Sequence, residues 1–211
     1  MIISGGEASS SDLHDIWAFD LELCQWTQLE VQFEAPFHAK RFHSASALSQ
    51  NRVLTFGGCH SEYVHMNDLN IFYFDNFVKS NGADKLVVCD RVNFDKKDVV
   101  PSSRWGHTAS VYQDKMYVLG GRNEVDICDL FEFDPSTMKW SEITFANRVP
   151  KPRRRHSAAF ISSSLVMFGG FDGEFFNDMH ALHLNEQRKN CIKIDKSRID
   201  RDFASLLNNA S

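Results

Sequence analysis

The sequence predicts an all-β protein built from repeated four-stranded units. Two observations support this: a glycine pair recurs along the chain, and the same strand pattern surrounds each copy. The pairs follow one another at steps of 52, 63 and 49 residues and stand at Gly5-Gly6, Gly57-Gly58, Gly120-Gly121 and Gly169-Gly170. A period of about 50 residues fits one supersecondary unit that buries its apolar faces against its neighbours.

The first two strands of each unit form a predicted β-hairpin. His43, His107 and His156 precede the next glycine pair by 14, 13 and 13 residues. Each histidine opens a strand of small residues, which a short polar turn connects to an apolar strand ending on the glycines. Glycine suits that end because the chain must turn with a positive φ or approach a neighbouring unit closely.

Two further strands complete the unit. After each glycine pair comes a polar loop and then an aromatic or apolar strand, read as DIWAFD, NIFYFD, DLFEFD and MHALHL. Trp26 and Trp140 mark a fourth strand about 20 residues beyond their pairs, and KLVVCDRV and CIKI occupy the same slot without tryptophan. Four antiparallel strands at this period predict the blade of a β-propeller.

The repeat resembles the kelch motif over about residues 1–195. The resemblance depends on the apolar strand ending in Gly-Gly, the aromatic third strand, the later tryptophan and the Arg-x-x-His lead-in, seen from Arg104 to His107 and from Arg153 to His156. One copy departs from the pattern, because Lys40 stands where the arginine is expected, with Arg41 beside it. A lysine there keeps the positive charge but loses the bidentate geometry of a guanidinium.

The predicted blades span about residues 1–35, 36–98, 99–147 and 148–195. The first is partial because it begins at its second strand, so the sequence predicts a kelch-type propeller of about three and a half blades. Closed propellers need roughly four to eight blades. We therefore expect the chain to be completed by further blades or by another copy, and not to behave as a simple monomer.

Residues 196–211 depart from the repeat. Ile199, Phe203, Leu206 and Leu207 lie on one face of a predicted short amphipathic helix. This segment is similar to the helix that precedes the BTB domain in kelch-BTB proteins of the leucine-zipper-like regulator type. No BTB sequence follows it here.

Composition limits the classes of partner. The net charge is −5 and no basic stripe is present, which disfavours nucleic acid. No apolar run approaches the roughly 20 residues of a membrane-spanning helix. Five scattered cysteines without a C-x-x-C pair fit reduced thiols, so we expect a cytoplasmic protein without a disulfide framework, metal or cofactor.

The lead-in residues and the tryptophans have two interpretations each. A histidine beside an arginine could act in acid–base catalysis. However, a single active site would not recur once per blade, so a structural role is favoured for the lead-in residues, with hydrogen bonds between neighbouring strand ends. Core packing is likewise favoured over ligand stacking for the tryptophans, except Trp105, whose place beside a lead-in lets it reach the surface. A metal at His60 and His65 near Cys59 is disfavoured because no full ligand set accompanies them.

Recognition is expected in the loops that follow the glycine pairs, because these differ in every copy while the strands agree. Aromatic and arginine side chains dominate interface energetics. The predicted contact residues are Tyr63, His65, Arg122, Asn123, Glu124, Phe175 and Phe176. The alternatives are that these loops are merely solvated and that both phenylalanines pack between blades. Residues 76–98 lengthen the second copy, as a second contact arm or a tolerated insertion.

These features favour a protein-interaction module. The kelch-BTB resemblance implies the substrate-recruiting part of a BTB/cullin-type ubiquitin-ligase adaptor. The alternative is a cytoskeletal or small-GTPase-associated kelch scaffold. A propeller enzyme is less favoured, because the sequence singles out no nucleophile with a neighbouring base in one copy alone.

Overall fold

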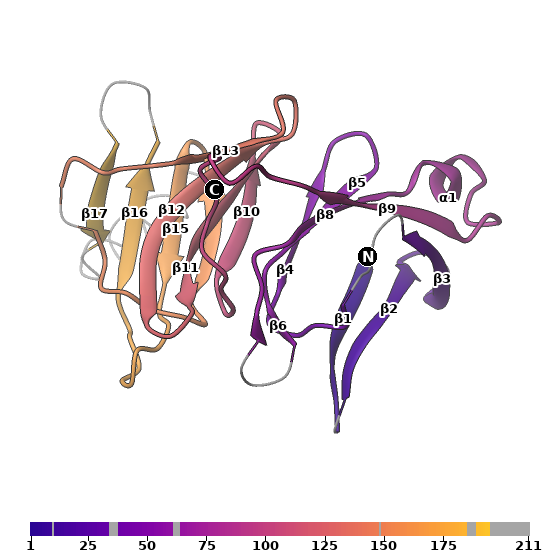
Figure 1. Cartoon of the computed structure of the whole chain (residues 1–211), viewed down its shortest axis with the longest axis horizontal. Helices are drawn as coiled ribbons and strands as arrows, with labels where there is room; N and C mark the ends of the chain where they lie inside the picture. Colours follow the sequence, from indigo (N-terminus) through magenta and orange to yellow (C-terminus); the bar gives the residue numbers. More distant parts are fainter. Residues whose placement is uncertain (10, 34–37, 61–63, 148, 185–188, 195–211) are drawn as a thin grey trace, which may run out of the picture.

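The computed structural model describes residues 1–9, 11–33, 38–60, 64–147, 149–184 and 189–194. Its sheets follow one another along an arc, with the first and last at opposite ends (Figure 1). The helix predicted for residues 196–211 lies outside the described residues.

The strands group into four blades that follow the sequence repeat. Blade 1 contains β1 (Ile2–Ala8), β2 (Ser11–Asp20) and β3 (Gln25–Phe33), and blade 2 contains β4 (Ser44–Leu48), β5 (Arg52–Phe56), β8 (Leu69–Tyr73) and β9 (Leu86–Val92). Blade 3 contains β10 (Thr108–Tyr112), β11 (Lys115–Arg122), β12 (Asp126–Asp134) and β13 (Lys139–Glu142). Blade 4 contains β14 (Ser157–Ile161), β15 (Ser164–Phe168), β16 (Met179–His183) and β17 (Asn190–Ile194). The short strands β6 (Cys59–His60) and β7 (Val64–His65) pair with each other in the loop after the second glycine pair.

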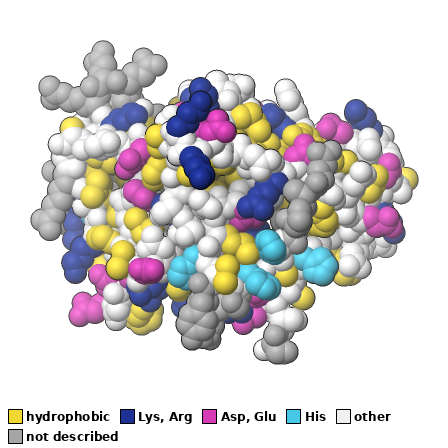
Figure 2. All heavy atoms as spheres, in the orientation of Figure 1, with side chains coloured by type: hydrophobic (Ala, Val, Ile, Leu, Met, Phe, Trp, Pro, Cys, Tyr) yellow, Lys and Arg dark blue, Asp and Glu magenta, His cyan; other side chains and the backbone are white. Residues whose placement is uncertain are grey.

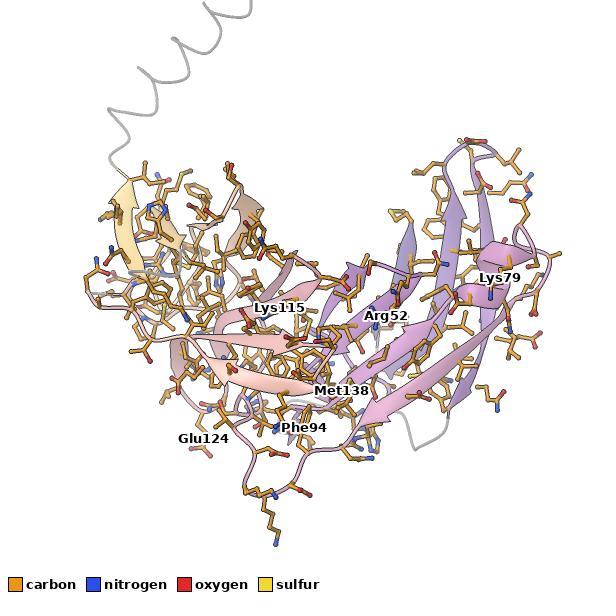
Figure 3. The ribbon with its side chains drawn as sticks, turned by 90° about the horizontal axis from the view of Figure 1, so that it is seen from above. Arg52, Lys79, Phe94, Lys115, Glu124 and Met138 are labelled. Carbon is orange, nitrogen blue, oxygen red and sulfur yellow. The ribbon has the colours of Figure 1, made fainter. Side chains whose placement is uncertain are left out.

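Each of blades 2 to 4 is an antiparallel sheet in which the strands lie in chain order. Their first strands contact one another, β4 with β10 and β10 with β14, so these strands form the inner edge of the array. Seen from above, the sheets surround a concave side (Figure 3). Inner strands that meet while the sheets fan outward are the arrangement of a β-propeller, here a partial one.

Residues 76–98, which lengthen the second copy, have a structural role. After the short helix α1 (Asp75–Lys79) the segment forms β9, the outer strand of blade 2. The other edge of β9 pairs in parallel with the end of β3, matching Glu30–Phe33 with Leu86–Cys89. Blades 1 and 2 therefore share one seven-stranded sheet, a connection that the repeat pattern does not predict.

The core lies between blades. Leu54 and Phe56 of blade 2 face Val118 and Phe133 of blade 3, and all four are fully buried. Successive residues of a strand point to opposite faces of the sheet, so alternate side chains face the preceding blade and the others face the following blade. Blades 2 and 3, which have a described blade on either side, therefore depend on both neighbours for their burial.

The two repeat tryptophans occupy equivalent strand positions in different surroundings. Trp140 is 5% exposed, and its ring centroid lies 5.1 Å from those of both Phe56 and Phe133. Trp26 is 47% exposed, and its ring centroid lies 4.7 Å from that of Phe19 in its own blade, with the ring planes tilted by 43°. The interpretation of Trp26 as a core residue is therefore wrong in this structure, because no described blade covers that face of blade 1.

Other features bear on the class of protein. All five cysteines are free thiols, with Cys59, Cys89 and Cys191 buried in the sheets. Among the described residues, no helix is long and apolar enough to cross a membrane.

The tryptophan pair gives a direct test of where the core lies. Trp140→Ala should lower the free energy of unfolding by about 3–5 kcal/mol, because it leaves a cavity between blades 2 and 3. Trp26→Ala should cost about 1 kcal/mol or less, because the ring is half exposed. Urea unfolding followed by circular dichroism measures both. Equal losses would contradict the inter-blade core.

Candidate functional site

The buried basic residue of each lead-in binds an aspartate of its own blade. Here the lead-ins are Lys40–His43, Arg104–His107 and Arg153–His156. Arg104 forms a bidentate pair with Asp129, with 2.8 Å between Nη2 and Oδ2, and also donates to the carbonyl oxygen of Gly120 at 3.1 Å. Arg153 repeats this arrangement with Asp178, at 2.5 and 3.2 Å, and with the carbonyl oxygen of Gly169 at 2.9 Å.

Lys40 supplies the same charge with simpler geometry. Its Nζ lies 2.8 Å from Oδ2 of Asp68, and the amide of Asn70 donates to the same carboxylate at 2.9 Å. Burial lowers the pKa of Lys40, while the pair with Asp68 opposes that shift. The three aspartates were not predicted from the sequence as partners of these basic residues. Their signal is an Asp directly before the apolar run of each third strand, 28, 25 and 25 residues beyond the basic residue.

The lead-in histidine bonds across the junction between blades. Nε2 of His107 lies 2.8 Å from the hydroxyl of Ser44 in blade 2, and Nε2 of His156 lies 2.9 Å from the hydroxyl of Thr108 in blade 3. Burial lowers the pKa of His107 to about 3 and of His156 to about 4, with the neighbouring arginine acting in the same direction. His43 is similar, with burial and then Lys40 lowering its pKa to about 4. These histidines are neutral at pH 7.

The glycine pair completes the junction. The N–H of Gly58 donates to the carbonyl oxygen of Arg104 at 2.8 Å, and the N–H of Gly121 donates to that of Arg153 at 3.0 Å. A Cβ placed on Gly57 would lie 2.7 Å from the carbonyl oxygen of Arg104 and 3.0 Å from the His107 ring. Glycine is therefore required both by its φ of +62° and by this close approach.

A row of aromatic and guanidinium groups crosses the same end of the blades, which we call the loop end. This row contains side chains from the two residues between the basic residue and the histidine of a lead-in, and from the loop after the last glycine pair. The Arg155 guanidinium lies 5.3 Å from the centroid of Phe42 and 5.4 Å from that of Trp105. Arg154 lies 5.5 Å from Trp105 and 4.8 Å from the Phe171 ring, which in turn contacts Phe175 at 4.9 Å.

The arginines in this row differ in their partners. Arg154 donates to both carboxylate oxygens of Asp126 at 2.7 Å, and Arg122 contacts the same carboxylate at 3.0 Å. Arg41 pairs with Glu7 and Asp12 of blade 1. Arg155 is exposed and pairs with no carboxylate among the described residues. Its stacking between two rings holds a free positive charge in place.

The predicted contact residues separate into two places. His65, Asn123 and Glu124 line one open cavity of about 450 Å³ between the loops of blades 2 and 3. Phe175 and Phe176 line another of about 330 Å³ beside Arg155, on blade 4. Arg122 is held by Asp126, and Tyr63 lies outside the described residues.

The two phenylalanines have different surroundings. Phe175 is 89% exposed, the highest value among the large apolar side chains of the described residues. The Phe176 ring lies 3.8 Å from the guanidinium of the buried Arg153 and is partly covered. Phe175 is therefore free to contact a partner, whereas Phe176 belongs to the support of the lead-in. Trp105 reaches the surface only in part, between the arginines.

Histidine side chains gather toward the loop end on one face of the molecule (Figure 2). The rings of His38 and His60 lie 6.3 Å apart, and Nδ1 of His60 bonds the carbonyl oxygen of Ala39 at 2.9 Å. In the part of the chain that the structure describes, no group of three or more His, Cys, Asp or Glu residues is placed to hold a metal ion.

One nucleophile–base arrangement does occur, although the sequence singles out none in any single copy. In blade 4, Cys191 Sγ lies 3.8 Å from Nδ1 of His180, whose Nε2 lies 3.0 Å from Asp178. The sequence could not reveal it, because strand pairing brings together residues 11 and 13 positions apart. Burial raises the pKa of the Cys191 thiol, and the Asp178 carboxylate is already bound by Arg153, so the arrangement does not favour a thiolate nucleophile.

Fold and site together define a repeat propeller whose blades are joined through buried lead-ins and whose loop end presents arginine and aromatic side chains. The family model of the kelch motif matches residues 104–144. Tip elongation aberrant protein 1 of Schizosaccharomyces pombe is 32% identical over 189 residues, which cover 86% of this chain and 16% of that protein. Kelch domain-containing protein 3 of Mus musculus is 32% identical, covering 81% of this chain and 47% of that protein.

Host cell factor 2 of Homo sapiens is 30% identical over 166 residues, covering 72% of this chain and 21% of that protein. The chain therefore spans less than half the length of each of these three relatives. With the motif match, the similarity supports the assignment that the geometry indicates: the chain is a kelch-repeat protein.

The buried histidines predict a loss of stability in mild acid. Their folded pKa values lie near 3 to 4, below the unfolded value of about 6.5, so below pH 6.5 the unfolded state binds protons that the folded state does not. Each such histidine should lower the free energy of unfolding by up to about 1.4 kcal/mol per pH unit between pH 6 and pH 4.5. Urea unfolding across this range should show the slope, and His107→Asn should reduce it. A constant free energy of unfolding from pH 7 to pH 4.5 would contradict the neutral histidines.

Proposed function

We propose that this chain is a protein-interaction module that binds its partner at the loop end. The observation that carries the proposal is the row from Phe42 through Arg155 and Trp105 to Phe175, because it presents exposed aromatic and arginine side chains on a rigid support. Such side chains supply most of the energy of protein interfaces. The partner contacts expected in the loops extend this row with His65, Asn123 and Glu124.

The support beneath the row favours binding over catalysis. The buried charges of the lead-ins are each matched by an aspartate, and their histidines are neutral and engaged between blades. These groups hold the scaffold, and the three basic side chains are buried beneath the loop end. A scaffold of agreeing strands with loops that differ in each copy is typical of repeat proteins that recognise other proteins.

Two narrower roles are alternatives within this proposal. In the first, the chain recruits substrates for a BTB/cullin-type ubiquitin ligase. In the second, it is a cytoskeletal or small-GTPase-associated kelch scaffold. Both place the protein in the cytoplasm and use the same loop end. The identity of the captured partner separates them, since a ligase subunit favours the first and a cytoskeletal protein or GTPase the second.

Phe175 gives the sharpest test of the binding surface. Phe175→Ala should weaken partner binding about tenfold or more, because a largely exposed aromatic ring in a contact surface can act as a hot spot once the partner buries it. It should leave the unfolding free energy within about 0.5 kcal/mol of wild type. The measurement is affinity capture with quantitative mass spectrometry, followed by a titration of the recovered partner.

A matched control is Val78→Ala, which removes an exposed apolar side chain from α1. Its partner recovery should equal that of the wild type. Phe176→Ala should instead lower stability, because Phe176 covers Arg153. Unaltered partner recovery with Phe175→Ala would refute the assignment of this surface.

A further inference from the structure

Two blade faces at the ends of the arc lack a neighbour in the described chain. The trailing face, on blade 4, exposes Ile161, Phe168 and Ile192. The leading face, on blade 1, exposes Ile3 and Trp26. Large apolar side chains gathered on two sheet faces indicate surfaces that are covered in the assembled protein.

The trailing face repeats the face that blade 2 turns toward blade 3. Ile161 follows the lead-in histidine by five residues, as the buried Leu48 does. Phe168 immediately precedes the glycine pair, as the fully buried Phe56 does. Phe168 is nevertheless 43% exposed, because no described blade lies against it.

The leading face repeats the face that blade 3 turns toward blade 2. Ile3 precedes its glycine pair by two residues, as the buried Val118 does. Trp26 pairs with Phe19 across the outer strands, as Trp140 pairs with Phe133. The two end faces are thus the two halves of a junction that the chain already forms once.

We propose that a second copy of this chain packs its leading face onto the trailing face, with Trp26 of one copy against Phe168 of the other. This contact reproduces the Phe56–Trp140 contact, whose ring centroids lie 5.1 Å apart. The choice of a second copy comes from the residue types. The other internal junctions carry Leu119 with Cys191 and Ser4 with Cys89 at these positions, so Phe opposite Trp is a specific match.

The geometry is head to tail, because the two contacting faces are different surfaces of the molecule. Such an interface closes into a ring when the rotation permits. Two copies of the four described blades, the first of which has three strands, together supply eight blades, within the range of about four to eight known for propellers. In a closed dimer each copy contributes both faces, and the Trp26–Phe168 contact forms twice.

The contact should be weaker than an internal junction. Each described lead-in already bonds to the preceding blade of its own copy, so none of them is free to reach the other copy's glycine pair. Ser44 and Thr108 each bond the lead-in histidine of the following blade. Ser157 occupies the equivalent position in blade 4, but no histidine of a following blade is present among the described residues. We therefore expect reversible association that depends on protein concentration.

Sedimentation velocity over a range of concentrations tests the proposal. The wild-type chain should associate, and both Phe168→Asp and Trp26→Arg should weaken association at least tenfold. Val125→Asp, a charge on an exposed apolar residue outside both faces, should have no effect. Circular dichroism and urea unfolding establish that each variant is folded.

A mixture of the two variants makes the test specific. Combining Phe168→Asp with Trp26→Arg leaves one wild-type contact and sets the introduced aspartate against the introduced arginine in the other. The mixture should therefore associate more strongly than either variant alone. A wild-type chain that stays monomeric at about 100 μM, a concentration at which contacts of micromolar affinity form, would overturn the proposal. So would a mixture that associates no better than its components.

Discussion

The structure depends on one repeated contact, the approach of a lead-in to the glycine pair of the preceding blade. At this point a backbone carbonyl and a histidine ring come so close to the first glycine that no side chain fits there. The second glycine donates its N–H to that carbonyl. The buried lysine or arginine beside it would be costly without a carboxylate, and the aspartate of the same blade removes that cost. One contact thus combines backbone geometry, hydrogen bonding and charge neutralisation.

This contact separates the residues that hold the propeller from those available to a partner. Arg104 and Arg153 are fully engaged beneath the loop end, whereas the residues directly following them in the lead-ins vary from copy to copy. Two of these residues, Arg154 and Arg155, pack against the rings of Phe42, Trp105 and Phe171. The variable side chains are therefore attached to a rigid part of the fold. Preorganised side chains lose less entropy on binding. The geometry of the recognition surface therefore depends on the junction between blades that lies beneath it.

Much of the fold could be predicted from the sequence, because glycine pairs, histidines and alternating strand residues recur at the same positions in each repeat. The four-stranded blades and the partial propeller follow from that pattern alone. The parallel pairing of β3 with β9 could not be predicted, since it joins strands of two different repeats. Nor could the exposure of Trp26, because a repeat position fixes which way a side chain points but not whether a neighbouring blade covers it. Among the candidate site residues, Phe175 and Phe176 cannot be told apart from the sequence. The structure distinguishes them, because Phe176 lies against Arg153 whereas Phe175 is exposed.

The most direct test of the central contact compares Gly57→Ala with Gly169→Ala. Both glycines have nearly the same φ, +62° and +67°, so alanine suffers the same left-handed strain at each, about 1–2 kcal/mol. They differ in the neighbouring blade: a Cβ on Gly57 meets the Arg104 carbonyl oxygen at 2.7 Å, whereas on Gly169 the nearest atom is the Phe176 carbonyl oxygen at 3.5 Å. Equilibrium urea unfolding should show that Gly57→Ala costs at least about 2 kcal/mol more than Gly169→Ala, as expected for overpacking against backbone. Equal losses for the two variants would contradict the account.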